Sequence, residues 1–179
     1  MKLGIIGCGN MAYAIAGGIL KSGIINNSNI FVYDLIPAKS DSFKKEFNIK
    51  VCDNIEETVN KSEAVLIAVK PGDLEKSLKS INKLLKNKLL ISIVAGKTIA
   101  FIKNITGDIP VARVNPNTPA LIREGISGIA FSENVDENQK KWILDLFSSV
   151  GIVKEFPEKL LDAVTGLAGS GPAFVFIAI

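Results

Sequence analysis

Residues 3–12 read Leu3-Gly4-Ile5-Ile6-Gly7-Cys8-Gly9-Asn10-Met11-Ala12, a short apolar run followed at once by a glycine-rich turn. In a strand–turn–helix unit, Gly7 permits the tight turn and Gly9 lets the backbone approach a diphosphate. Ala12 allows the helix to pack closely on the strand, and the free N–H groups at the start of that helix attract anions. The stretch therefore predicts a βα unit that binds a dinucleotide. The alternative is a plain strand-to-helix glycine turn.

Downstream of this unit, apolar runs typical of strands alternate with amphipathic patterns typical of helices. The expected strands are residues 3–6, 30–33, 64–69, 89–94 and 111–114, with peripheral strands at 126–131 and 151–153. The expected helices are residues 11–21, 37–47, 54–61, 74–85 and 136–149, the last with Trp142, Leu146 and Phe147 facing the core. This alternation predicts an α/β fold, a Rossmann-type mostly parallel sheet with helices on both faces.

Past residue 156 the alternation gives way to a purely helical pattern. Residues 158–167 are expected to be helical, Gly169-Ser170-Gly171-Pro172 breaks the pattern, and an apolar helix begins at residue 173. We expect residues 1–156 to form a dinucleotide-binding Rossmann domain. Residues 157–179 are expected to be the truncated beginning of an all-α domain. A natural, an engineered and a proteolytic end at Ile179 are all compatible with this pattern.

Composition excludes several classes of function. The 179 residues include no histidine, which rules out Ser-His-Asp triads and histidine-ligated zinc. Cys8 and Cys52 are too far apart for a disulfide scaffold or a four-cysteine metal site, so we expect no metal and a cytoplasmic location. A net charge of +3 with interspersed signs gives no case for nucleic acid, and no run of about 18 apolar residues predicts a membrane span. The turn at residues 7–10 interrupts the first apolar run, so no signal peptide is expected.

Asp34 ends the second expected strand, 25 positions after Gly9. A carboxylate there would hydrogen-bond an adenosine ribose and repel a 2′-phosphate, which favours NADH over NADPH. Lys39, five residues on, could neutralise such a phosphate, so NADPH stays a possible cofactor. The alternative for Asp34 is a turn residue before Pro37. Cys8 could have a lowered thiol pKa at the helix N-terminus, the alternative being a small residue that simply fits.

Small and polar residues follow the later strands, at the sheet edge where ligands bind in this topology. Lys70 follows one buried strand, the alternative being a solvated lysine before a helix, and Ala95-Gly96 follows the next. Asn117 lies in a loop held rigid by two prolines. The predicted cofactor-binding residues are Gly7, Cys8, Gly9, Asn10, Met11, Ala12, Asp34, Ala68, Val69, Lys70, Pro71, Ala95, Gly96 and Asn117.

Six motifs together resemble the pyrroline-5-carboxylate reductase family, and they occur in the family's order over nearly the whole chain. They lie at residues 7–12, Ala68-Val69-Lys70-Pro71, Ala95-Gly96, 116–120, Arg123-Glu124-Gly125 and 162–174. The last motif is the most specific, because nothing in a generic dinucleotide-binding fold requires Gly-Ser-Gly-Pro there. Asn115 stands where the family more often has methionine, a departure that concerns loop packing only.

The resemblance implies a cytoplasmic oxidoreductase of proline biosynthesis. With NADPH or NADH it would transfer a hydride to the imine carbon of 1-pyrroline-5-carboxylate and give L-proline. It also implies that Lys70 and Asn117 lie near the nicotinamide, and that a helical domain forms a homodimer or higher homo-oligomer. The family's hydroxyl donor to the substrate would lie beyond Ile179, so we expect the fragment alone to be inactive. The alternatives are a related Rossmann imine or hydroxy-acid reductase and a non-catalytic dinucleotide-binding module.

Overall fold

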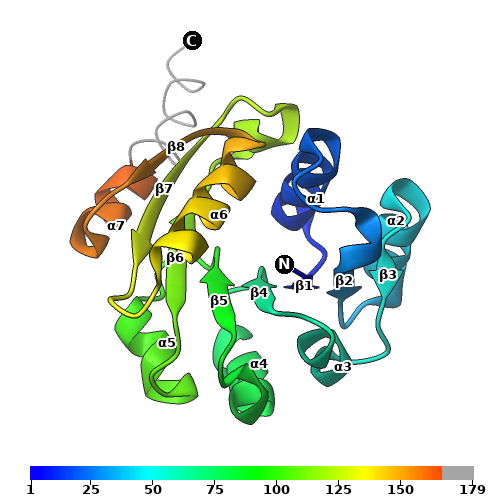
Figure 1. The fold of residues 1–179 in the computed structure, drawn as a ribbon, viewed down its shortest axis with the longest axis horizontal. Helices are drawn as coiled ribbons and strands as arrows, with labels where there is room; N and C mark the ends of the chain where they lie inside the picture. The colour runs from blue at the N-terminus through cyan, green and yellow to red at the C-terminus, as the bar shows by residue number, and fades with distance from the viewer. Residues whose placement is uncertain (167–179) are drawn as a thin grey trace.

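Eight strands form one sheet at the centre of the molecule, in the order β3-β2-β1-β4-β5-β6-β7-β8 (Figure 1). The computed structural model describes residues 1–166. Every residue of β1, β4 and β5 is buried, as expected for strands covered by helices on both faces. The strands are β1 (Leu3–Ile6), β2 (Ile30–Tyr33), β3 (Lys50–Val51), β4 (Ala64–Ile67), β5 (Leu89–Ser92), β6 (Val111–Asn115), β7 (Gly125–Phe131) and β8 (Gly151–Glu155).

The strand order reverses at β1. From β1 the chain moves outward through β2 and β3, and then returns to the other side of β1 to build β4, β5 and β6. All pairings among these six strands are parallel, whereas β7 runs antiparallel to β6 and parallel to β8. In open sheets of this kind ligands bind at the carboxyl ends of the strands beside the reversal, here between β1 and β4.

Helices cover both faces of the sheet and build two apolar cores. On one face α1, α2 and α6 contribute Ile15, Phe43 and Phe147, and on the other α3, α4 and α5 contribute Val59, Leu78 and Ile102. The α-helices are α1 (Asn10–Ser22), α2 (Pro37–Phe47), α3 (Ile55–Asn60), α4 (Leu74–Ile81), α5 (Ile99–Thr106), α6 (Glu137–Ser148) and α7 (Leu161–Val164). Short 3-10 turns are η1 (Asn27–Asn29), η2 (Asn82–Leu85), η3 (Thr118–Ile122) and η4 (Glu158–Leu160).

Local sequence signals set the helix ends. Gly23 adopts a left-handed conformation, φ 74°, and ends α1, because glycine takes a positive φ without steric cost. Pro37 stands in the first turn of α2, where its missing N–H has no intrahelical acceptor. At the start of α6 the Asp136 side chain and the Gln139 side chain each accept a hydrogen bond from the other residue's backbone N–H.

The predicted Rossmann-type, mostly parallel sheet is confirmed. The strands predicted over 64–69 and 89–94 end two residues earlier, because the chain leaves the sheet at its carboxyl edge. The helix predicted over 74–85 is α4 followed by a 3-10 turn. On α6, Leu146 and Phe147 are buried as predicted, and Trp142 is only partly buried against the same core.

Two elements go beyond the sequence-based prediction. β3 has only two residues, too few for a periodic pattern, and it forms because it pairs with β2. α5 opens with the apolar run from Ile99 to Ile102, which does not by itself indicate a helix, but the Thr98 hydroxyl accepts from the Phe101 N–H and so caps the start of one. Thr98 is thus the local signal that reveals this helix.

The segment predicted to be helical over 158–167 begins as η4 and continues as α7, whose Leu161 is fully buried. The predicted Gly-Ser-Gly-Pro break and the helix predicted from residue 173 lie outside the described residues. Within residues 1–166 no helix is long and apolar enough to cross a membrane.

The close approach of β7 and β8 at their first residues, Gly125 and Gly151, leads to a stability prediction. Gly151 has φ +145°, and a Cβ there would lie 2.0 Å from the carbonyl oxygen of its register partner Gly125. Gly151→Ala is therefore expected to lower the free energy of unfolding by about 3 kcal/mol, measured by urea denaturation followed through Trp142 fluorescence. Gly72→Ala is the control, since a Cβ there meets no atom within 4 Å. Equal losses in both variants would contradict the prediction.

Candidate functional site

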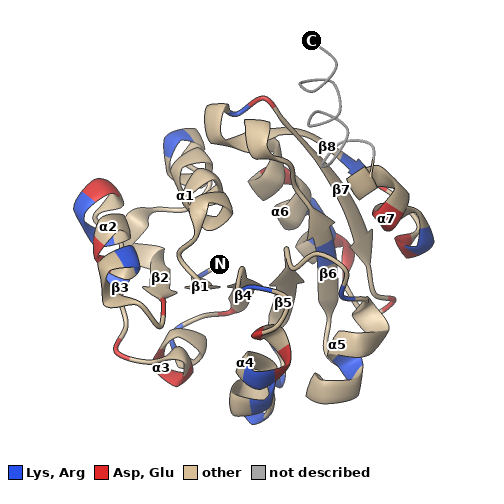
Figure 2. Cartoon of the chain, turned by 180° about the vertical axis from the view of Figure 1, so that it is seen from behind, with Lys and Arg blue, Asp and Glu red and all other residues tan. Residues whose placement is uncertain are grey.

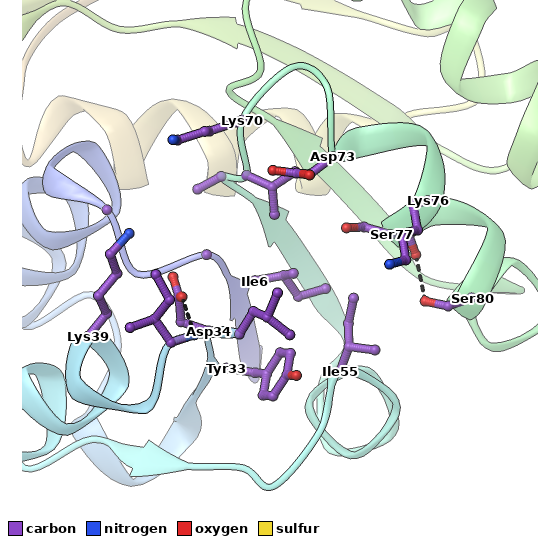
Figure 3. Close-up of a pocket in the computed structure, with 16 residues that line it drawn as sticks. Ile6, Tyr33, Asp34, Lys39, Ile55, Lys70, Asp73, Lys76, Ser77 and Ser80 are labelled. Atoms are coloured by element: carbon purple, nitrogen blue, oxygen red, sulfur yellow. Dashed lines mark hydrogen bonds between the residues drawn. The ribbon is translucent and has the colours of Figure 1, made fainter.

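A cleft of about 470 Å³ opens at the carboxyl ends of β1, β2 and β4, beside the point where the strand order reverses (Figure 3). Its floor is the glycine-rich turn, and its walls come from the turn after β2 and from the polar side of α4. The lining residues are Ile6, Gly7, Gly9, Tyr33, Asp34, Leu35, Ile36, Lys39, Ile55, Ala68, Val69, Lys70, Asp73, Lys76, Ser77 and Ser80.

The turn between β1 and α1 is shaped by backbone approach. Gly7 has φ +94°, its N–H donates to the Tyr33 carbonyl at 2.9 Å, and a Cβ on it would lie 2.7 Å from the Ala68 carbonyl oxygen. Gly9 differs, because a Cβ there would meet no atom within 4 Å. Gly7 is thus required by the fold, whereas Gly9 leaves open space in front of the backbone at the start of α1.

α1 begins in a way that suits an anion. Its N-cap is Gly9, which brings no side chain to the first free N–H groups, and its first turn contains no acidic residue. A helix start of this kind combines free N–H donors with the positive end of the helix dipole. The N–H groups that follow Gly9 are therefore the donors available to a diphosphate in the cleft.

Asp34 holds the glycine-rich turn in place. Its Oδ2 accepts from the Cys8 N–H at 2.7 Å, and its Oδ1 accepts from the Ile36 N–H at 2.9 Å. Asp34 is therefore both a turn residue after β2, the alternative considered from the sequence, and a charged group that lines the cleft. Because Asp34 takes the Cys8 N–H, that donor does not serve an anion in the cleft. Each carboxylate oxygen keeps a second lone pair for a further donor.

The environment of Cys8 corrects the suggestion of a lowered thiol pKa. Burial, and to a lesser extent the nearby Asp34 charge, raise the pKa of the Cys8 thiol to about 12, while Lys39 only partly opposes them. The thiolate is disfavoured in a dry site beside a carboxylate, and this outweighs the helix N-terminus. Cys8 is thus the small residue that fits, not a reactive thiol.

Positive side chains surround the cleft. Figure 3 shows Lys39, from α2, beside Asp34, while Lys70 lies across the cleft in the loop between β4 and α4. Lys76 adds a third ammonium group from α4. All three side chains, of Lys39, Lys70 and Lys76, are exposed to solvent. Salt therefore screens their attraction for an anionic ligand, and the range of that attraction falls as the ionic strength rises.

The structure brings together six of the predicted residues: Gly7, Gly9, Asp34, Ala68, Val69 and Lys70 line the cleft. The others lie around it. Cys8 and Ala12 are buried behind the turn, Asn10 and Met11 begin α1, and Pro71 follows Lys70 outside the lining.

Three predicted residues lie further along the sheet edge. Ala95 and Gly96 are exposed in the loop after β5. Asn117 uses its Oδ1 to accept from the Ile126 N–H at 2.8 Å, which ties η3 to the start of β7. The role of all three toward a cofactor stays a prediction.

Sequence reasoning missed the wall that α4 contributes. Asp73, Ser77 and Ser80 lie four and three positions apart and line the cleft together with Ile55 from α3. The signal was present, because these polar residues form a stripe directly beside the buried Leu74, Leu78 and Ile81 of α4. Which polar face meets a ligand depends on how the helix packs, and periodicity alone does not specify that.

Comparison of the sequence with known proteins identifies a matching family model and relatives of known activity. The family model of NADP oxidoreductases that depend on coenzyme F420 matches residues 2–96. The pyrroline-5-carboxylate reductase of Methanosarcina acetivorans is 37% identical over 180 residues, which are 99% of this chain and 67% of that protein. That of Arabidopsis thaliana is 36% identical, with 99% and 65% covered. The chain thus spans about two thirds of the length of these curated relatives.

Solved structures agree as well. A pyrroline-5-carboxylate reductase from Coxiella burnetii superposes with a TM-score of 0.94 at 29% identity, covering 99% of this chain and 67% of that one. The Plasmodium falciparum pyrroline carboxylate reductase with NADP bound gives a TM-score of 0.88 at 34% identity, with 99% and 65% covered.

The environment of Cys8 generates a reactivity prediction. A pKa of about 12 instead of 9.0 lowers the thiolate fraction at pH 8 about a thousandfold. In a Cys52→Ala variant, iodoacetamide is therefore expected to modify the folded chain at least about a hundredfold more slowly than the urea-unfolded chain. Because the folded-state pKa is raised, this thiol also contributes stability that is lost as the pH rises above 9 toward 12. Equal alkylation rates for folded and unfolded chain would disprove this account.

Proposed function

Because the chain belongs to the pyrroline-5-carboxylate reductase family, we propose that it binds a reduced nicotinamide dinucleotide and that the protein reduces 1-pyrroline-5-carboxylate to L-proline. The observation that carries the proposal is the open start of α1 at the strand-order reversal. When bound, the cofactor supplies a hydride to the C5 imine carbon, the ring nitrogen takes a proton, and C=N becomes CH–NH. This is the last step of proline biosynthesis.

The residues present fit a dinucleotide. Open space lies in front of Gly9, and the N–H groups after it have no capping side chain. The diphosphate would lie there, above the carboxyl end of β1. In this proposal one nucleoside would extend toward β2 and the other toward β4 and β5.

The adenosine half is assigned to the β2 side of the cleft. Leu35, Ile36 and Ile55 offer apolar surface to a planar base, and Ser77 and Ser80 offer hydroxyl groups from α4. This end of the cleft therefore suits a heterocycle that needs both stacking surface and hydrogen bonds.

Asp34 supports NADH as the preferred cofactor. Its carboxylate stands at the end of β2, where the adenosine ribose would lie, and a 2′-phosphate would meet a like charge. Lys39 offsets part of that repulsion, so the preference is expected to be modest.

The nicotinamide half is assigned to the edge formed after β4 and β5. Ala68, Val69, Ala95 and Gly96 leave room for the ring, and Lys70 places an ammonium group at the rim of the cleft. This chain would orient the ring and exclude water on one side, which needs no acid or base from these residues. Asn117 remains a candidate at this end.

The domain boundary and the assembly are part of the proposal. β8 ends at Glu155 and only helical elements, η4 and α7, follow it in the described part of the chain; the proposed boundary between residues 156 and 157 rests on this change, although Leu161 still packs in the core of the sheet domain. By analogy with the family we assign the residues that follow to a helical domain that joins two or more copies. Two free, buried cysteines are typical of a reducing compartment, which supports the cytoplasm.

Gly9→Val tests the dinucleotide site. The fold tolerates a side chain there, because Gly9 has φ −82° and a Cβ would meet no atom within 4 Å. The valine would occupy the space assigned to the diphosphate, so the Kd of NADH is expected to rise at least about tenfold. Fluorescence titration measures this change, and urea denaturation checks that the free energy of unfolding is unchanged. An unaltered Kd in the stable variant rules out this site.

Asp34→Asn tests the cofactor preference. Removing the charge is expected to shift the ratio of NADPH Kd to NADH Kd about threefold or more in favour of NADPH. The ratio is the useful quantity, because a weakened hydrogen bond to the glycine-rich turn would affect both cofactors alike. Asp41→Asn is the matched control on the exposed side of α2. Wild-type binding of NADPH ten times tighter than NADH would overturn the assignment.

Turnover separates the remaining alternatives. In the protein that carries these residues, NADH is expected to be consumed with 1-pyrroline-5-carboxylate and not with an open-chain 2-oxo acid. The opposite preference would indicate a related hydroxy-acid reductase. Tight NADH binding with neither substrate reduced would indicate a dinucleotide-binding module.

A further inference from the structure

An arginine is buried inside the sheet domain at a place that stability alone does not explain. Arg113, in the middle of β6, is 1% exposed. Its Nη1 lies 3.3 Å from Oε1 of Glu158, and its Nη2 donates to the Asp162 carboxylate. Figure 2 shows this pattern as positive charge on β6 within the sheet and negative charge on α7.

Glu158 joins this arginine to a third element. The same Oε1 accepts from the Ile99 N–H at 2.7 Å, and Ile99 is the first residue of α5. A helix start leaves such N–H groups without an intrahelical acceptor, so Glu158 supplies one from 59 residues away. One carboxylate therefore connects β6, the beginning of α5 and η4.

Asn115 strengthens the same attachment. It lies two positions after Arg113, hence on the same face of β6. Its Nδ2 donates to the Leu161 carbonyl at 3.0 Å and to the Thr165 hydroxyl at 2.6 Å. Side chains of β6 thus hold residues 158–165 at four points.

The energetics favour a positioning role over a stabilising one. Burying a guanidinium group carries a desolvation cost that its ion pairs only offset, and apolar replacements of buried ion pairs are often neutral or stabilising. Arg113 also leaves its Nε–H without an acceptor within residues 1–166, which adds to the cost. What the ion pairs do provide is a fixed direction and distance between the elements they join.

The element positioned in this way does not line the cleft itself, but it lies at the same edge of the sheet, next along from β4. α5 follows directly on the loop from Ala95 to Thr98, which leaves the sheet at the carboxyl end of β5. With the adenosine half on the β2 side, this loop lies toward the nicotinamide half. Glu158 holds the start of α5, and with it the far end of that loop.

We propose that Arg113, Glu158 and Asp162 are positioning residues that fix the loop after β5 and residues 158–165 relative to each other, at the part of the sheet edge assigned to the nicotinamide half. The inference rests on the proposed binding of a nicotinamide dinucleotide. It assigns these three residues no contact with cofactor or substrate. Their effect passes through the backbone at the start of α5.

Glu158→Ala is the test, with NADH and ADP-ribose as paired ligands in the 179-residue chain. ADP-ribose lacks the nicotinamide, so a defect confined to that end weakens NADH alone. We expect the Kd of NADH to rise about fivefold while the Kd of ADP-ribose stays within about twofold. Glu158→Gln keeps an oxygen for the Ile99 N–H and is expected to restore part of the loss. Glu137→Ala, which removes an exposed carboxylate paired with Lys140, is the matched control and should leave both Kd values unchanged.

Hydrogen exchange locates the effect. In Glu158→Ala, the amides of residues 96–101 and 158–165 are expected to exchange at least about tenfold faster, while β1 and β4 keep their protection. Arg113→Met, which fills the volume without charge, is expected to show the same local pattern in a folded chain.

The outcomes separate the two proposals. If the wild-type chain binds neither ligand, the proposed function fails and this inference falls with it. If the wild type binds both and the variant weakens both equally, or neither, the dinucleotide site stands and the positioning role is overturned.

Discussion

The close approach of three strands at Gly7 is the constraint on which the rest of the structure depends. The Gly7 N–H donates to the end of β2, and its Cα lies against the backbone that leaves β4, so closely that no side chain fits. This contact directs the chain from β1 into α1 between two neighbouring strands. The helix therefore begins at the sheet edge where the strand order reverses, with its first N–H groups facing open space.

The negative charge of Asp34 stabilises the structure of the candidate site itself. Both carboxylate oxygens of Asp34 accept hydrogen bonds from backbone N–H groups, one from Cys8 in the glycine-rich turn and one from Ile36 in its own turn. The same carboxylate, together with burial, keeps the Cys8 thiol protonated. The residue to which we assign the cofactor preference thus also holds the glycine-rich turn, and this links the shape of the candidate site to its electrostatics.

Different interactions hold the β2 side of the site and the sheet edge toward β5. On the β2 side, apolar side chains and α4 hydroxyl groups form the walls, and the turn after β2 is held by the hydrogen bond from the Ile36 N–H to Asp34. Toward β5 the sheet edge continues beyond the lining of the cleft as a loop, and a loop needs attachments to hold one position. Here the attachment is a buried guanidinium group between two carboxylates, reinforced by Asn115. Asn115 adds hydrogen bonds to the segment that follows β8.

Periodicity and turn chemistry were sufficient to predict the sheet class, nearly every strand and helix, and the glycine-rich turn as the centre of the site. These features depend on neighbouring residues, whose spacing is visible in the chain. The two-residue β3, the Ser77 and Ser80 wall, and the sign of the Cys8 pKa shift were not predictable in this way. The same holds for the contact of Glu158 with Ile99, because each arises between residues that only folding brings together. Neighbouring residues determine helices, strands and turns, and the sequence alone therefore predicts them. Burial, charge environment and long-range hydrogen bonds exist only once the strands have paired.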